Sequence, residues 1–471
     1  MPIYPDINSL QEALQARETS TVAIVQHYLQ QIEETQHLNI YVEVFADEAL
    51  KKAQSQDQAR AKGEKLGKLA GVVISLKDVI CYQDHRVSAG SKILENFVSP
   101  YSATSVERLL AEDAIIIGRT NCDEFAMGSG NENSFYGPTR NAADPRCVPG
   151  GSSGGAAVSV QADTCLIAVG SSTGGSVRQP ANFCGLYGVK PTYGRVSRHG
   201  LIAYGSSFDQ IGLLGKKPKD LALVLEIIAG ADGFDSTAPN RIVPFYSQQK
   251  SEGPKKIAYF PEVLDHPGLA PEIKADTKNT LQTLRAAGHD LVPVKFELFD
   301  HVVSTYYVLT TAEASSNLSR FDGLRYGYRS PEVSNLEETY RKSRSEGFGT
   351  EVQRRILLGT FVLSSGYYDA YYSRAQRVRR LIRDQLRGIL AKHDFLMMPV
   401  SPSLPWQVGE QVNDPVANYL ADIYTVLANL AGIPGIAIPT VKDEATGLPM
   451  GYQLLADNWK EGELLAFAGT F

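Results

Sequence analysis

Two loops rich in glycine and serine carry the residues best suited to chemistry in this sequence. They contain the stretches PGGSSGGAA (149–157) and STGGSVRQP (172–180), in which Ser152 lies 24 positions before Ser176. Glycine in such loops lets backbone N–H groups approach a ligand closely, although it costs conformational entropy. Neither loop has the lysine of a P-loop or a Gly-x-Gly-x-x-Gly fingerprint. Because tight turns alone would not need so many hydroxyls, the loops favour a serine nucleophile over phosphate binding.

A serine nucleophile needs a base, because a hydroxyl attacks poorly at its ordinary pKa. The one histidine near either loop is His199, whereas Lys77 ends the apolar stretch ISLK. Burial disfavours the charged form of a lysine, and Ser–Lys pairs are an established variant of serine catalysis. From the residues alone, Lys77 as a neutral base and Lys77 as a solvated surface charge both remain open.

Short apolar segments that alternate with helical patterns would position these loops. Such alternation needs crossover connections, so we predict an α/β fold with a largely parallel, buried sheet. We expect one domain over 1–471, with the catalytic loops in 70–210 and an aromatic-rich helical cover at about 300–390. The apolar segments expected to form strands are 71–76, 114–118, 165–170, 256–260, 289–294, 395–400 and 434–439.

Composition and charge argue against several classes of protein. Hydrophobic residues make up 43% and charged residues 21% of the chain, which is typical of a globular fold. The formal net charge of −6 argues against binding nucleic acid by charge alone. The five cysteines and eight histidines have no metal-binding spacing, so we expect reduced thiols and no metal site. Since we find no secretory signal, we expect a cytoplasmic protein.

Four ordered blocks of sequence resemble the amidase signature family over nearly the whole chain. They are GVVISLKDV, MGSGNENSFYGPTRNAADP, PGGSSGGAAVSV and GSSTGGSVRQPANFCGLYGVKPTYGRVSRHGL. The spacings of 75 residues from Lys77 to Ser152 and 24 from Ser152 to Ser176 agree with that family. The resemblance implies the amidase signature fold, a large mixed, mostly parallel central sheet covered by helices on both faces.

The resemblance also implies a Ser-Ser-Lys triad. Ser176 would be the acyl nucleophile, Ser152 the bridging serine, Lys77 the neutral base and Ser153 a supporting hydroxyl. In the family the peptide bond before the bridging serine is cis. Four backbone amides would form the oxyanion hole, namely those of Thr173, Gly174, Gly175 and Ser176, and one such donor is worth roughly 3 kcal/mol.

Within the family the chain is most similar to the glutamine-hydrolysing A subunits of tRNA-dependent amidotransferases. The stretches that carry this resemblance include EASSNLSRFDGLRYG and RRILLGTFVLSSGYYDAYY. It implies subunits B and C as partners, with ATP and Mg²⁺ used on the partner subunit to amidate Glu-tRNA(Gln), Asp-tRNA(Asn) or both with ammonia from glutamine. No cofactor is expected in this chain.

The same resemblance implies a pocket for free glutamine. Arg355 would pair with the α-carboxylate through its planar fork, and Asp422 would take the α-ammonium. Ser129 and Tyr306 would line the pocket, although Tyr307 beside Tyr306 could fill that role instead.

One residue departs from the family pattern. The nucleophile loop of the family commonly carries an aspartate at the position of Ser172, and a serine supplies no charge there. Two other functions are left open: a stand-alone amidase that hydrolyses small acyl or aryl amides, and a scaffold with an inactive amidase fold.

Overall fold

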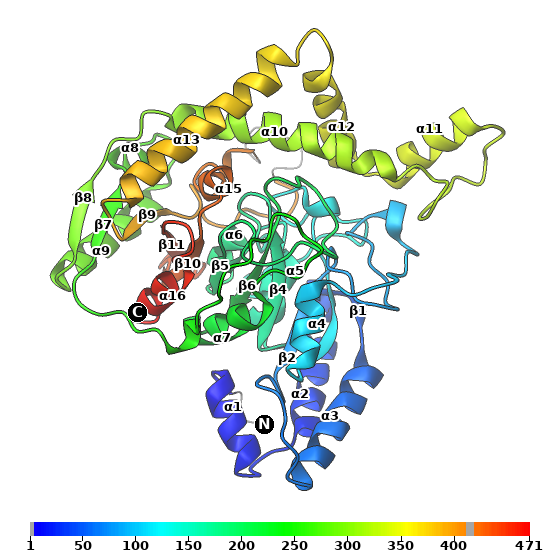
Figure 1. The fold of residues 1–471 in the computed structure, drawn as a ribbon, viewed down its shortest axis with the longest axis vertical. Coiled ribbons are helices and arrows are strands. Elements are labelled where there is room, and N and C mark those ends of the chain that lie inside the picture. The colour runs from blue at the N-terminus through cyan, green and yellow to red at the C-terminus, as the bar shows by residue number, and fades with distance from the viewer. Residues whose placement is uncertain (1–3, 411–418) are drawn as a thin grey trace.

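Eleven strands join in one mixed sheet in the computed structural model, which describes residues 4–410 and 419–471 (Figure 1). Their order across the sheet is β1-β3-β2-β4-β6-β5-β10-β11-β9-β7-β8. The strands are β1 (Tyr41–Val44), β2 (Val73–Lys77), β3 (Ile115–Thr120), β4 (Ile167–Ser172), β5 (Tyr187–Lys190), β6 (Gln210–Gly215), β7 (Lys256–Tyr259), β8 (Asp290–Pro293), β9 (Phe395–Pro399), β10 (Gly435–Lys442) and β11 (Pro449–Leu455).

The expected α/β class with a large mixed sheet is confirmed, but the expected predominance of parallel pairs is wrong. Four strand pairs are parallel and six are antiparallel. All seven strands expected from apolar segments are present, and they form the four parallel pairs among themselves. Each antiparallel pair contains at least one of β1, β5, β6 and β11, which the sequence pattern did not reveal.

Helices cover both faces of the sheet. Gly212 and Gly215 on β6 are three residues apart and therefore point to opposite faces. A Cβ on Gly212 would meet Val177, directly before α6, whereas a Cβ on Gly215 would meet Leu221 of α7. The helices outside the cover are α1 (Ile7–Gln15), α2 (Thr21–Glu34), α3 (Ala46–Ala61), α4 (Thr104–Ala111), α5 (Gly154–Gln161), α6 (Arg178–Phe183), α7 (Pro218–Ile228), α8 (Pro261–Leu264), α9 (Pro271–Ala286), α15 (Val426–Ala431) and α16 (Glu461–Ala468).

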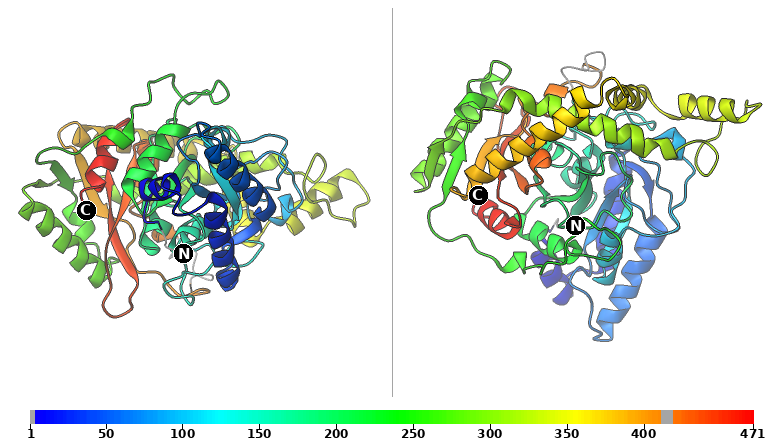
Figure 2. Two further views of the ribbon diagram at one scale, coloured as in Figure 1. Left: turned by 90° about the horizontal axis from the view of Figure 1, so that it is seen from below. Right: turned by 45° about the horizontal axis from the view of Figure 1, so that its top comes forward.

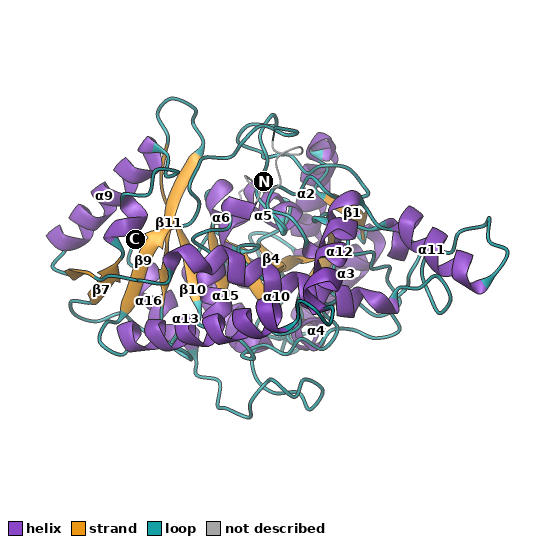
Figure 3. Cartoon of the chain, turned by 90° about the horizontal axis from the view of Figure 1, so that it is seen from above, coloured by secondary structure: helices purple, strands orange, loops and turns teal. Residues whose placement is uncertain are grey.

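Residues 300–390 form helices that lie over one end of the molecule. They are α10 (Val302–Asn317), α11 (Leu336–Gly347), α12 (Thr350–Leu363) and α13 (Arg374–Leu390). Helices α10 and α13 cross above the sheet, and α11 projects sideways (Figures 1 and 3). The N-terminal helices, blue in Figures 1 and 2, gather at the opposite end. No helix in the described residues is both long and apolar enough to cross a membrane.

Strand direction brings the two catalytic segments together. β2 and β4 are parallel neighbours, so Lys77 at the end of β2 and Ser172 at the end of β4 lie at the same edge of the sheet. Helix α5 packs against both strands and begins directly after Ser153. The ends of β2 and β4 and the start of α5 therefore converge on one place.

Candidate active site

Lys77 is fully buried at the end of β2. Its Nζ donates hydrogen bonds to Ser152 Oγ at 2.7 Å and to Ser153 Oγ at 2.9 Å. Burial lowers the pKa of Lys77 to about 8, although Cys122, Asp123 and Asp209 oppose the shift. A useful fraction of the amine is therefore neutral in mildly alkaline solution, and Lys77 is not a solvated surface charge.

Ser152 and Ser153 are also fully buried. The peptide bond between Gly151 and Ser152 is cis, as the family resemblance implies. The Ser153 hydroxyl donates to the carbonyl oxygen of Ser171 at 3.0 Å, near the end of β4. Ser153 thus ties the lysine to the strand that leads into the second serine loop.

Ser176 lies in the turn between β4 and α6, and its exposed fraction is 6%. The two glycines before it are in close contact with the opposite wall. A Cβ on Gly174 would lie 2.7 Å from the Tyr306 hydroxyl oxygen, and a Cβ on Gly175 would lie 2.7 Å from an Asp422 carboxylate oxygen. Both positions therefore require glycine, because any side chain would collide with these groups.

The backbone of the turn has free hydrogen-bond donors. None of the amides of residues 173–176 donates to another group in 4–410 or 419–471. Buried amides without partners are rare in folded proteins, so this turn is suited to bind an anionic oxygen. Within the same described residues, no hydrogen bond joins the hydroxyls of Ser152 and Ser176.

Asp422 is buried beside the nucleophile turn and is held by two hydroxyls. Ser129 Oγ donates to its Oδ2 at 3.0 Å, and Tyr307 Oη donates to the same oxygen at 3.2 Å. Burial raises the pKa of Asp422 to about 6, while the Ser129 hydrogen bond and the charge of Arg355 oppose this shift. The carboxylate is therefore ionised at neutral pH and can receive a cationic group.

Arg355 is buried among tyrosine rings. Its Nε donates to Glu351 at 2.8 Å and its Nη1 donates to Tyr204 Oη at 2.8 Å. The guanidinium carbon also lies 5.4 Å from the ring centre of Tyr307 and 5.5 Å from that of Tyr419. The Glu351 carboxylate and the tyrosine rings fix the orientation of the guanidinium, as a binding site for a planar anion requires.

The two adjacent tyrosines of α10 occupy different parts of the site. Tyr306 directs its hydroxyl at the nucleophile turn, and Tyr307 lies between Asp422 and Arg355. Both therefore line the space that the sequence analysis assigned to glutamine, and Tyr307 contacts both charged groups.

Sequence reasoning missed several residues that support the nucleophile turn. Asp209 accepts a hydrogen bond from Thr173 Oγ1 at 2.6 Å, and burial raises the pKa of Asp209 to about 6. Glu351, which orients Arg355, was also missed. A signal was present for Asp209, because it lies in the stretch GSSFDQIG, but its partner is 36 positions away.

Arg178 is the other supporting residue that was missed. Its side chain is fully buried and donates to the carbonyl oxygens of Gly174 at 2.9 Å and Thr425 at 2.7 Å. No carboxylate in the described residues lies within ion-pair distance of this guanidinium. Ser172, where the family commonly has aspartate, donates its hydroxyl to the same Gly174 carbonyl at 3.0 Å.

Comparison with known proteins agrees with this geometry. A family model described as Amidase matches residues 23–465. The chain belongs to the amidase family. The A subunit of glutamyl-tRNA(Gln) amidotransferase from Chlorobium phaeobacteroides is 49% identical over 472 residues, which cover 99% of this amidase and 98% of that protein. The A subunit of the same enzyme from Legionella pneumophila is 47% identical and covers 98% and 95%.

Solved structures of other amidases have the same fold. The crystal structure of the A subunit of glutamyl-tRNA(Gln) amidotransferase from Thermotoga maritima has a TM-score of 0.78 and 36% identity, covering 95% of this chain and 90% of that one. The native peptide amidase of Stenotrophomonas maltophilia has a TM-score of 0.82 and 30% identity, covering 98% and 95%.

Proposed function

We propose that this amidase is the glutamine-hydrolysing A subunit of a tRNA-dependent amidotransferase. The observation that carries the proposal is the identity of 46–49% with A subunits of glutamyl-tRNA(Gln) amidotransferases over 98–99% of the chain. Identity with the solved peptide amidase is lower, at 30%. The two buried charges, Asp422 and Arg355, support glutamine as the substrate because they match its α-ammonium and α-carboxylate.

In the proposed reaction, Ser176 Oγ attacks the carboxamide carbon of glutamine. The Ser176 proton passes to Ser152 Oγ while the Ser152 proton passes to Lys77 Nζ. The hydrogen bond from Lys77 to Ser152 at 2.7 Å and the lowered pKa of Lys77 support this route. The missing contact between the two serines must form when substrate binds, as catalytic hydrogen bonds often do.

Collapse of the tetrahedral intermediate then breaks the C–N bond. The proton returns through Ser152 to the departing nitrogen, so ammonia leaves and a glutamyl ester of Ser176 remains. Water attacks this ester and releases glutamate. Both intermediates place an oxyanion near the turn 173–176, whose free amides would stabilise it, each by roughly 3 kcal/mol.

The substrate would be oriented by its two α-substituents. Asp422, held by Ser129 and Tyr307, would bind the ammonium, and Arg355 would bind the carboxylate through its remaining N–H groups. A substrate without both charges would leave one of these buried groups unpaired, and such a loss costs about 1.5–3 kcal/mol. Tyr306 would close the pocket above the nucleophile turn.

The ammonia would be used on partner subunits. We propose subunits B and C as partners, with ATP and Mg²⁺ bound on the first of these, where mischarged Glu-tRNA(Gln), Asp-tRNA(Asn) or both would be amidated. We also propose that the chain works in the cytoplasm as one domain over 1–471. The five cysteines are all unpaired and buried, which suits a reducing compartment.

The test is ammonia release from L-glutamine by the purified chain, alone and with subunits B and C, ATP and mischarged tRNA. We expect activity that appears or rises sharply in the complex and is lost in Ser176→Ala. Hydrolysis of simple amides without partners, with glutamine ignored, would instead identify a stand-alone amidase. Tight assembly with both partners but no acylation of Ser176 would identify an inactive scaffold.

A further inference from the structure

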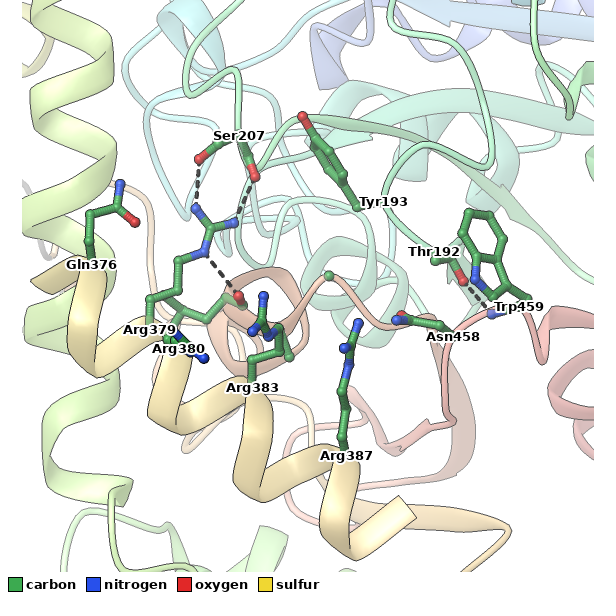
Figure 4. A pocket seen from close by; sticks show the side chains of 13 residues that line it. Thr192, Tyr193, Ser207, Gln376, Arg379, Arg380, Arg383, Arg387, Asn458 and Trp459 are labelled. Atoms are coloured by element: carbon green, nitrogen blue, oxygen red, sulfur yellow. Dashed lines mark hydrogen bonds between the residues drawn. The ribbon is translucent and has the colours of Figure 1, made fainter. Parts of the chain in front are cut away.

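A pocket of about 520 Å³ lies on the side of α13 that faces the end of α15, away from the catalytic residues (Figure 4). Its volume is within the range of cavities that bind small ligands. A stripe along α13 forms one wall, and loops after β5 and β11 form the others. The lining residues are Thr192, Tyr193, Ser207, Gln376, Arg379, Arg380, Arg383, Arg387, Leu430, Ala431, Gly432, Asn458 and Trp459.

The pocket concentrates positive charge in an acidic protein. Helix α13 carries six arginines, one aspartate and no lysine, although the whole chain has a net charge of −6. Four of these arginines line the pocket, and none of the lining residues is acidic. Such a cluster is costly because like charges repel, so the arginines need either internal partners or an anionic ligand.

Internal partners account for one of the four arginines. Arg379 donates to Leu430 O at 3.0 Å and to both oxygens of Ser207, at 2.7 and 2.8 Å, so its guanidinium is fully engaged in holding the fold. Arg380 and Arg383 share the single carboxylate of Asp384.

Arg387 reaches only an amide in the described part of the chain. In the orientation of Asn458 that satisfies both of its neighbours, the side-chain oxygen accepts from Arg387 Nη2 at 2.9 Å. Figure 4 shows Arg383 and Arg387 extending from α13 into the pocket, toward the loop that carries Gly432 and Asn458. Their N–H groups are available to a ligand.

The aromatic residue of the pocket is already occupied. The guanidinium carbons of Arg195 and Arg241 lie 4.6 Å and 4.8 Å from the ring centre of Trp459. Two cations stacked on the indole leave it unsuited to bind a nucleobase. The recognition elements that remain are therefore guanidinium groups rather than a stacking platform.

We propose that this pocket binds the phosphate chain of a polyphosphorylated ligand. Planar guanidinium forks match phosphate oxygens, and a stripe composed only of arginine is typical of that recognition. Arg380 and Arg387 are seven residues apart, a rise of roughly 10 Å, so a single phosphate would not satisfy the stripe. The phosphates come from a free nucleotide or from an RNA backbone, and the site adds a function that glutamine hydrolysis does not require.

The experiment is a calorimetric titration of the purified chain with sodium tripolyphosphate, in low salt and without glutamine. We expect saturable binding that Arg383→Gln with Arg387→Gln weakens about 100-fold, because two charge-assisted contacts are lost. The control is Arg374→Gln with Arg377→Gln, an equal change of charge on the same helix outside the pocket. Neither pair includes Arg379, so the folded structure is retained, which circular dichroism checks.

Parallel titrations with ATP and with a short RNA identify the source of the phosphate. Competition by ATP supports a free nucleotide, and competition by RNA supports the backbone. The proposal is overturned if tripolyphosphate does not bind, if the control variant weakens it equally, or if a polyglutamate peptide binds as tightly. Because no step uses glutamine, these results are independent of the proposed hydrolysis.

Discussion

Replacing Ser172 with aspartate tests the role of the unpaired buried cation behind the nucleophile turn. Ser172 and Arg178 both donate hydrogen bonds to the carbonyl oxygen of Gly174, so their side chains are near neighbours. Ser172→Asp would therefore place a carboxylate beside the Arg178 guanidinium. We expect a more stable protein with unchanged or faster glutamine turnover.

The magnitude follows from the cost of burying Arg178. Burial lowers the pKa of Arg178 to about 9, which corresponds to roughly 5 kcal/mol against the charged form. A carboxylate about 4 Å away attracts the cation by roughly 4 kcal/mol at an effective dielectric constant of about 20. Desolvation of the new carboxylate removes much of this gain, so we expect the free energy of unfolding to rise by about 1–2 kcal/mol.

The assay compares wild type, Ser172→Asp and Ser172→Asn by urea unfolding and by ammonia release from glutamine. Asparagine matches aspartate in size but has no charge, so Ser172→Asn isolates the electrostatic effect. The reasoning is refuted if the two variants are equally stable. A large loss of turnover in Ser172→Asp would also contradict it, because the carboxylate should order the turn.

Four further outcomes are expected. Activity measured as kcat/KM should rise as the pH passes through about 8, where Lys77 loses its proton, and Lys77→Ala should lower kcat by about 10²–10⁴-fold. Arg355→Gln should raise the KM for glutamine about 10–100-fold with little change in kcat, since a charge-assisted contact is lost. Glutamine binding should weaken in wild type as the pH falls below about 6, where Asp422 becomes protonated, and Asp422→Asn should bind weakly at every pH. Gly175→Ala should fold but lose turnover, because its Cβ would lie 2.6 Å from Thr425 Oγ1; full activity in this variant would contradict the close contact.

The strands that the sequence revealed and those that it hid differ in composition. Apolar, β-branched segments such as 114–118 mark buried strands that pair in parallel. β6 has the sequence QIGLLG and β11 the sequence PMGYQLL, in which glycine and proline lower the strand signal. These strands form their backbone ladders in the sheet centre, where tertiary pairing outweighs local propensity. A mostly parallel sheet was therefore expected because the antiparallel strands were not recognised.

The candidate site shows the same division between local and distant information. Lys77, Ser152 and Ser176 stand next to strand ends and glycine loops, which are visible in a single sequence. Glu351 and Asp209 act by holding another residue, and their roles depend on contacts that no local pattern encodes. Arg178 was hidden for a further reason, since its burial without a carboxylate partner is known only once the core is assembled.

The junction between β5 and β10 governs when the sheet can be completed during synthesis. These neighbours join residues 188–190 to residues 435–437, so about 245 residues separate the two sides of the junction. At 5–20 residues per second, a ribosome needs about 10–50 s to produce β10 after β5 has been made. During that interval the outer edge of β5 has no partner and is open to pairing with other chains. Since β5 spans only Tyr187–Lys190, with a glycine at its second position, this edge offers a short template, and the nascent chain is correspondingly protected from aggregation.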